Sequence, residues 1–207
     1  MTSSRPRYAY LVAIALAAVV GGLGHWSGSV PWTQPAAAAE PDAFSPYVDA
    51  KGNISLPTDY KTTFVHLGTF AVAGKTKVGA PVDSLHGVYA RPEDVTAFQR
   101  DGKFPDGAVI VKDVLKVKSD ALTTGTVTWA TDVDVWFVMI KDSKGRFKDN
   151  ELWGDGWGWA LYQGKDPKKQ VATDYKTDCR ACHVPAKADD WLYLRGYPVL
   201  KEKPKGK

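Results

Sequence analysis

The sequence predicts a β-rich domain with short helices, and three observations lead to this prediction. Two long stretches alternate with a period of two residues, which is the spacing of strands. Turns rich in Gly, Pro and Asp separate these stretches, as in Phe104-Pro105-Asp106-Gly107. The clear helical start, Arg91-Pro92-Glu93-Asp94, opens only a short helix, because Gly102 follows soon after it.

Residues 1–39 have the pattern of an export signal. Arg5 and Arg7 precede an uncharged apolar run from Tyr8 to Leu23, and four alanines before Glu40 provide a cleavage site. Because the run is short for a helix that spans a membrane, we expect a cleaved signal peptide rather than a membrane anchor. Export would place the mature chain in an oxidising compartment, here the periplasm.

The charge of the mature chain does not point to nucleic acid as a partner. The export segment carries two arginines and no acid, so its removal lowers the formal net charge from +4 to +2. A nearly neutral chain gives no indication of nucleic-acid binding. The length that remains suits one domain with its own core.

The elements of this domain follow in order along the chain. Residues 40–55 are polar and contain Pro41 and Pro46, so we expect a lead-in segment with little regular structure. The β-forming residues of 62–73 and 85–90 predict the first two strands. The short helix described above follows them.

Two longer strands are expected next, over residues 108–118 and 124–141. In the first of them Val109 and Val111 fall on one face, whereas Ile110 and Lys112 fall on the other. In the second, Phe137 and Met139 alternate with Trp136 and Val138. Residues 159–162 are expected to form the last strand, and the basic tail 201–207 to fray.

The sequence Cys179-Arg180-Ala181-Cys182-His183 carries the chemistry of the chain. It is a C-x-x-C-H pattern, which is typical of covalent attachment of haem c. Residues at i, i+3 and i+4 of a helical turn lie on one side, so two thiols and one imidazole can face the same porphyrin. His183 would then be the axial ligand of the iron. The pattern occurs once, so we expect one haem.

Paired cysteines at this spacing also occur in zinc sites and in redox dithiols. A zinc site would need further ligands, but the chain has two cysteines and four histidines in all. A thioredoxin-like dithiol would stand between a strand and a helix early in a βαβ unit, whereas this pattern is late in the chain. Met139 is the only methionine besides the initiator, and a methionine in an apolar strand is more often a core residue than a sixth iron ligand.

Together, the export signal, the β-rich body and the C-terminal C-x-x-C-H resemble the cytochrome P-460 family, which includes the beta type of cytochrome c′. The resemblance covers residues 56–200, which we take as the haem domain. The further segments that resemble the family are Leu67-Gly68-Thr69, Gly87-Val88-Tyr89, Gly102 to Gly107, Val109-Ile110-Val111-Lys112, Lys141-Asp142-Ser143, Trp159 to Tyr162 and Gly196 to Leu200.

The resemblance implies a β-rich α+β fold, in which a mostly antiparallel sheet packs against one haem whose iron has an open distal side. In members that oxidise hydroxylamine, a lysine is cross-linked to the porphyrin rim, and Lys112 aligns with that lysine. The alternative for Lys112 is a solvated stripe that it forms with Lys116 and Lys118.

The chain departs from the hydroxylamine-oxidising pattern at two distal positions. His86 stands where an arginine is expected, and it could serve as a distal base, a sixth ligand or a structural residue. Phe137 stands where a glutamate is expected to accept protons, which a phenyl ring cannot do. General-base help in such a step is typically worth about 10²–10⁴-fold.

Three functions remain open at this point. The first is a periplasmic haem enzyme that acts on hydroxylamine or nitric oxide, the second a protein that binds nitric oxide without turnover, and the third a plain electron carrier. Lys112 favours the first, Phe137 favours the second, and an open sixth position argues against the third. The expected partners are a small nitrogen oxide and a periplasmic electron-transfer protein, while a homodimer is neither indicated nor excluded.

Overall fold

A computed structural model describes residues 44–74 and 81–202. The predicted export segment, residues 1–39, lies outside the described residues, as does most of the predicted basic tail. No helix in the described part of the chain is long and apolar enough to cross a membrane. The predicted division of the chain at residues 39, 55 and 200 stays a prediction.

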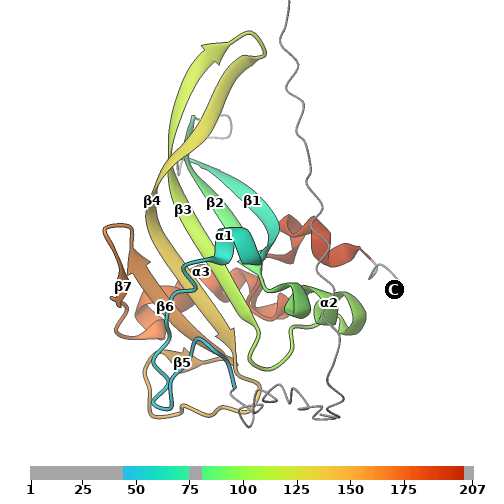
Figure 1. Cartoon of the computed structure of the whole chain (residues 1–207), viewed down its shortest axis with the longest axis vertical. Coiled ribbons are helices and arrows are strands. Elements are labelled where there is room, and N and C mark those ends of the chain that lie inside the picture. The colour runs from blue at the N-terminus through green and yellow to red at the C-terminus, as the bar shows by residue number, and fades with distance from the viewer. Residues whose placement is uncertain (1–43, 75–80, 203–207) are drawn as a thin grey trace, which may run out of the picture. The chain divides into compact units, whose positions relative to one another are not determined.

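Within the described residues, seven strands form one antiparallel sheet in the order β1-β2-β3-β4-β6-β5, with β7 paired to β6 (Figure 1). The strands are β1 (Val65–Ala73), β2 (Val82–Ala90), β3 (Val109–Leu122), β4 (Gly125–Lys141), β5 (Trp153–Gly154), β6 (Trp157–Gln163) and β7 (Asp166–Gln170). The predicted fold class, a β-rich chain with a mostly antiparallel sheet and short helices, is confirmed.

The helices in the described part of the chain are all short. They are α1 (Tyr60–Thr63), α2 (Pro92–Asp101), η1 (Lys176–Arg180), α3 (Ala181–His183), η2 (Val184–Asp189), η3 (Leu194–Gly196) and η4 (Pro198–Lys201). The helix expected after Arg91 is confirmed as α2, and Gly102 ends it in the left-handed region at φ 70°. The buried carboxylate of Asp94 accepts hydrogen bonds from the Arg91 guanidinium and, at 2.9 Å, from the Val109 amide, which joins this helix to β3.

One strand prediction is wrong. Residues 159–162 do form part of a strand, but it is not the last one, because β7 follows and pairs with β6. The strand β7 lies at the edge of the sheet, and its sequence, Asp-Pro-Lys-Lys-Gln, is polar. It therefore shows no alternation of apolar residues from which a strand could be predicted.

Both faces of β3 are buried over residues 109–111, which explains why this part of the strand alternates between two apolar sets. Val109 and Val111 are fully buried in one cluster, with Ile54 and Tyr60 from the segment before β1. Ile110 is buried in the other cluster, with residues of the C-terminal segment such as Trp191. Figure 1 shows α1 on the near side of the sheet and the orange-to-red C-terminal segment behind it.

The C-terminal segment lies directly against β1. A Cβ atom at Gly68 would overlap the carbonyl group of Gly196, and a Cβ at Gly196 would overlap the Phe70 ring. The two segments therefore approach this closely only because both positions lack a side chain. This contact places the residues after the C-x-x-C-H sequence on the sheet.

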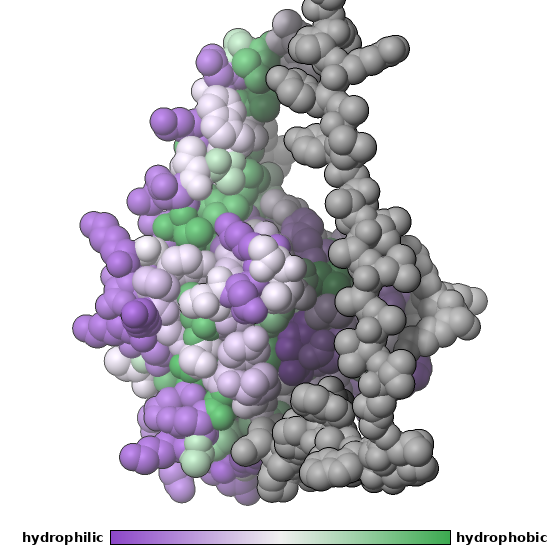
Figure 2. Space-filling view, in the orientation of Figure 1, coloured by the Kyte–Doolittle hydropathy of each residue, from purple (hydrophilic) through white to green (hydrophobic). Residues whose placement is uncertain are grey.

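The hairpin of β3 and β4 continues beyond the other strands (Figure 1). Figure 2 shows hydrophobic residues among hydrophilic ones along this projecting end, where Leu122 remains 54 % exposed and Trp129 41 % exposed. The buried part of the same two strands builds the pocket described next.

Candidate functional site

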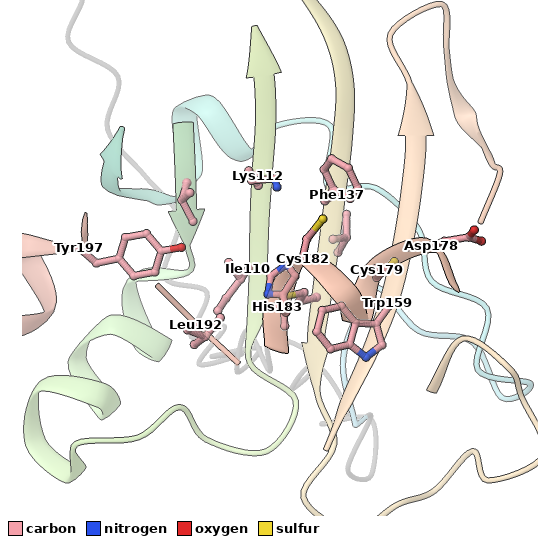
Figure 3. A pocket seen from close by; sticks show the side chains of 14 residues that line it. Ile110, Lys112, Phe137, Trp159, Asp178, Cys179, Cys182, His183, Leu192 and Tyr197 are labelled. Carbon is pink, nitrogen blue, oxygen red and sulfur yellow. The ribbon is translucent and has the colours of Figure 1, made fainter. Parts of the chain in front are cut away.

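A pocket lies between the sheet and the C-terminal helical segment (Figure 3). It holds about 630 Å³ of space that protein atoms do not fill, part of it open to solvent. Its wall on the sheet is mainly apolar and includes Val88, Ile110, Met139 and Trp159.

The C-x-x-C-H residues form the opposite wall. They lie on a continuous helical run, η1 followed by α3, which places Cys179, Cys182 and His183 at the pocket. Asp174 helps to begin this run, because its carboxylate accepts a hydrogen bond from the Lys176 amide at 2.8 Å.

The two cysteines are free thiols in different surroundings. Cys179 is buried, whereas Cys182 is exposed. Burial raises the pKa of the Cys179 thiol to about 11, an effect that the nearby Asp178 carboxylate increases. A thiol that stays protonated at neutral pH is a poor redox nucleophile, so Cys179 is not suited to be the attacking thiol of a dithiol.

The ring of His183 is oriented by one backbone group. Its Nδ1 lies 2.7 Å from the carbonyl oxygen of Trp191. Because a carbonyl only accepts, Nδ1 carries the hydrogen and Nε2 keeps the lone pair that can bind a metal. Burial, with a contribution from Lys112, lowers the pKa of His183, which favours the neutral form that ligation requires.

Lys112 faces the pocket from β3, and its surroundings are more apolar than those of Lys116 on the same strand face. Its Nζ lies 4.2 Å from the centroid of the Phe137 ring. Burial lowers the pKa of the Lys112 amine. Lys116, in contrast, has a side chain that is 58 % exposed and pairs with Asp134. The alternative of one solvated lysine stripe is therefore wrong for Lys112.

The structure brings together five of the six predicted site residues, namely Lys112, Phe137, Cys179, Cys182 and His183. Among the described residues, His86 is not one of those that line the pocket. It pairs with Val114 across the sheet, and its Nε2 lies 3.0 Å from the Ser84 hydroxyl. Burial lowers the pKa of His86, with a further effect from Lys112, so the two side chains influence each other.

Trp159, Leu192 and Tyr197 line the pocket but were not among the residues predicted for the site. Trp159, whose ring centroid is 4.9 Å from that of His183, falls on the pocket face of β6 and could have been found from the alternation of that strand. Leu192 and Tyr197 come from irregular backbone after the helical run, where no periodicity marks a buried position. Met139 belongs to the core cluster as well as the pocket wall.

Comparison with known protein families shows to which family the chain belongs. The family model described as Cytochrome P460 matches residues 57–194, a stretch that contains all six predicted site residues. The chain belongs to the cytochrome P460 family. A search of curated proteins found no match.

Membership of the cytochrome P460 family makes the chain a haem c cytochrome. The residues present fit that cofactor, because two free thiols and an imidazole with an available Nε2 face one largely apolar pocket. The donor set is that of haem c: thiols that form thioethers and a histidine that ligates iron.

Proposed function

We propose that this member of the cytochrome P460 family is a periplasmic protein with one haem c that binds nitric oxide in the pocket. Haem iron with an open coordination position supplies the binding of diatomic ligands and the transfer of single electrons. The chain's own residues attach the group, exclude water from its surroundings and select what can enter.

Attachment is assigned to Cys179, Cys182 and His183. The two thiols would hold the porphyrin through thioether bonds, and Nε2 of His183 would ligate the iron. The hydrogen bond from Nδ1 of His183 to the Trp191 carbonyl supports this role, since it fixes the ring and its tautomer.

The observation that carries the proposal is the lack of a free carboxylate in the pocket wall. Among the described residues that line the pocket, Asp178 alone carries a carboxylate. That group is occupied by the amides of Thr173 and Asp174, at 2.8 and 3.3 Å, and Figure 3 shows it turned away from Lys112 and Phe137. A neutral diatomic loses little on entering such an apolar space, whereas a substrate that must shed protons finds no carboxylate to take them.

Oxidation of hydroxylamine is the second candidate, and Lys112 is the observation that favours it. Lys112 aligns with the lysine that is cross-linked to the porphyrin in hydroxylamine-oxidising relatives, and burial lowers the pKa of its amine. A lowered pKa increases the share of neutral amine, which has the lone pair that bonding to the porphyrin rim requires. We propose this cross-link as a feature of the mature protein.

The cellular setting follows from the same assignments. Haem c is attached after export in bacteria, and residues 1–39 have the pattern of a signal peptide. A periplasmic electron-transfer protein would then exchange electrons with the haem. A plain electron carrier fits less well, because carriers normally keep six iron ligands and Met139 is already part of the core.

The test measures both activities on one preparation. The haem-loaded protein is titrated with nitric oxide by absorption spectroscopy, and its steady-state oxidation of hydroxylamine is measured with an artificial electron acceptor. We expect saturable nitric oxide binding with weak hydroxylamine turnover. Brisk turnover by the unaltered protein would favour the enzyme instead.

A further inference from the structure

Two consecutive residues after η2 adopt a backbone conformation that residues with side chains avoid. Asp190 has φ 57° and ψ 39°, and Trp191 has φ 67°. Aspartate tolerates the left-handed region because its short side chain can bond locally, but a bulky tryptophan there is unfavourable. Surrounding contacts must therefore hold this turn.

The Trp191 amide donates to the Ala186 carbonyl at 2.9 Å, and further contacts that hold the turn come from the sheet. The Lys141 ammonium at the end of β4 lies 2.7 Å from the Asp190 carboxylate, and the Lys141 side chain is only 13 % exposed. The indole of Trp157 in β6 donates to the Asp190 carbonyl at 3.1 Å. Lys141 also lies 4.7 Å from the centroid of the Trp157 ring. We refer to Lys141, Asp190 and Trp157 as the turn anchor.

The turn anchor decides where the next carbonyl points. The Trp191 side chain is 4 % exposed, so the residue is fixed at its ring as well as at its backbone. Its carbonyl oxygen is the group that accepts the hydrogen bond from Nδ1 of His183 at 2.7 Å. A change in the dihedral angles of Asp190 would rotate this carbonyl away from the imidazole.

We infer that Lys141 and Asp190 are positioning residues that tune the iron site through the Trp191 carbonyl. This inference rests on the proposed role of His183 as axial ligand. A strong hydrogen bond from Nδ1 raises the basicity of Nε2, which favours oxidised over reduced iron. Loosening the turn anchor weakens that bond, so it raises the reduction potential.

The experiment compares haem-loaded variants by redox titration and by resonance Raman spectroscopy of the reduced protein. Lys141→Met keeps the length of the side chain but removes its charge, and Asp190→Asn keeps the shape and the tolerance of positive φ. For each we expect the oxidised-to-reduced ratio at fixed potential to fall roughly tenfold, which is about 59 mV for one electron. The iron–histidine stretching frequency should fall as well. Lys141→Arg, which retains a cation, should restore much of both values.

Lys116→Met is the matched control, because it removes an exposed ion pair with Asp134 and an equal charge. It should leave the potential and the stretching frequency near those of the unaltered protein. The inference is overturned if Lys141→Met and Asp190→Asn shift neither quantity more than this control. Should Lys141→Met fail to load haem, the isosteric Asp190→Asn decides alone.

A separate variant keeps the inference distinct from the proposed function. His183→Ala removes the assigned ligand itself, so it should abolish the normal spectrum of the haem. If it does and the anchor variants change nothing, the ligand assignment stands and the anchor inference falls. If His183→Ala leaves the spectrum unchanged, the ligand assignment is the error.

Discussion

The Nζ atom of Lys112 lies 4.2 Å from the centroid of the Phe137 ring, and the two residues are direct partners across β3 and β4. Residues paired in this way share one face of an antiparallel sheet, and this face lines the pocket. The pair combines the two features that point to different functions, a buried amine and an aromatic ring. Each can be changed separately.

The proposed cross-link makes a prediction about Lys112 itself. Peptides from the mature haem-loaded protein should include haem joined to the segment that contains Lys112 as well as to the segment with both cysteines. Peptide mass spectrometry measures this, and the exposed Lys116 is the internal control, expected unmodified. Recovery of unmodified Lys112 would favour the likeness to the beta type of cytochrome c′.

Replacing Phe137 tests the role of the carboxylate that this position lacks. Phe137→Glu should raise hydroxylamine turnover by roughly tenfold or more, which allows a newly introduced carboxylate less than the ~10²–10⁴-fold effect of a well-placed general base. Stability should fall, because an unpaired carboxyl group in an apolar pocket is unfavourable and has a raised pKa. Phe137→Gln is the control for the steady-state assays, because glutamine has nearly the shape of glutamate but lacks its basic carboxylate. Equal turnover in both variants would rule out general-base help at this position.

Attachment of haem is predicted to need both thiols. In Cys182→Ala, at most the bond to Cys179 can form, so less haem should stay with the protein after denaturation. The comparison is the unaltered protein expressed with the same haem-maturation system. If the variant still held haem through two covalent bonds, the assignment of Cys182 as an attachment site would be wrong.

The close contact of β1 with the C-terminal segment predicts an effect on stability. A methyl group at Gly68 would overlap the Gly196 carbonyl, so Gly68→Ala should lower the free energy of unfolding by about 1–3 kcal/mol, as overpacking does. Gly74→Ala is the control, since its Cβ would meet only the flexible end of Asp83. Equal denaturation midpoints for the two variants would contradict the described packing.

Period-two alternation predicted the central strands well, because residues 109–111 of β3 and 138–140 of β4 are buried on both faces and each face carries its own apolar set. The same alternation put Lys112 on one strand face with Ile110, but it was the resemblance to the family that singled out Lys112 and Phe137, both of which line the pocket. The edge strands β5 and β7 could not be found in this way, since one has two residues and the other is polar.

The far wall of the pocket could not be predicted from alternation either. Leu192 and Tyr197 lie in irregular backbone whose path depends on contacts distant in sequence, such as that between Gly68 and Gly196. The local C-x-x-C-H pattern was visible at once, but the Trp191 carbonyl that orients His183 depends on a left-handed turn held from β4 and β6. No local pattern marks such a turn when it lacks glycine.

Binding of nitric oxide is tested most directly by titrating the reduced, haem-loaded protein with the gas and following its absorption spectrum. Because the pocket is apolar and the proposed iron site has an open position, we predict a spectral change that saturates at one nitric oxide per haem. The same change should occur in Phe137→Leu, which keeps the pocket apolar. An unchanged spectrum in excess nitric oxide would contradict the proposed open iron site.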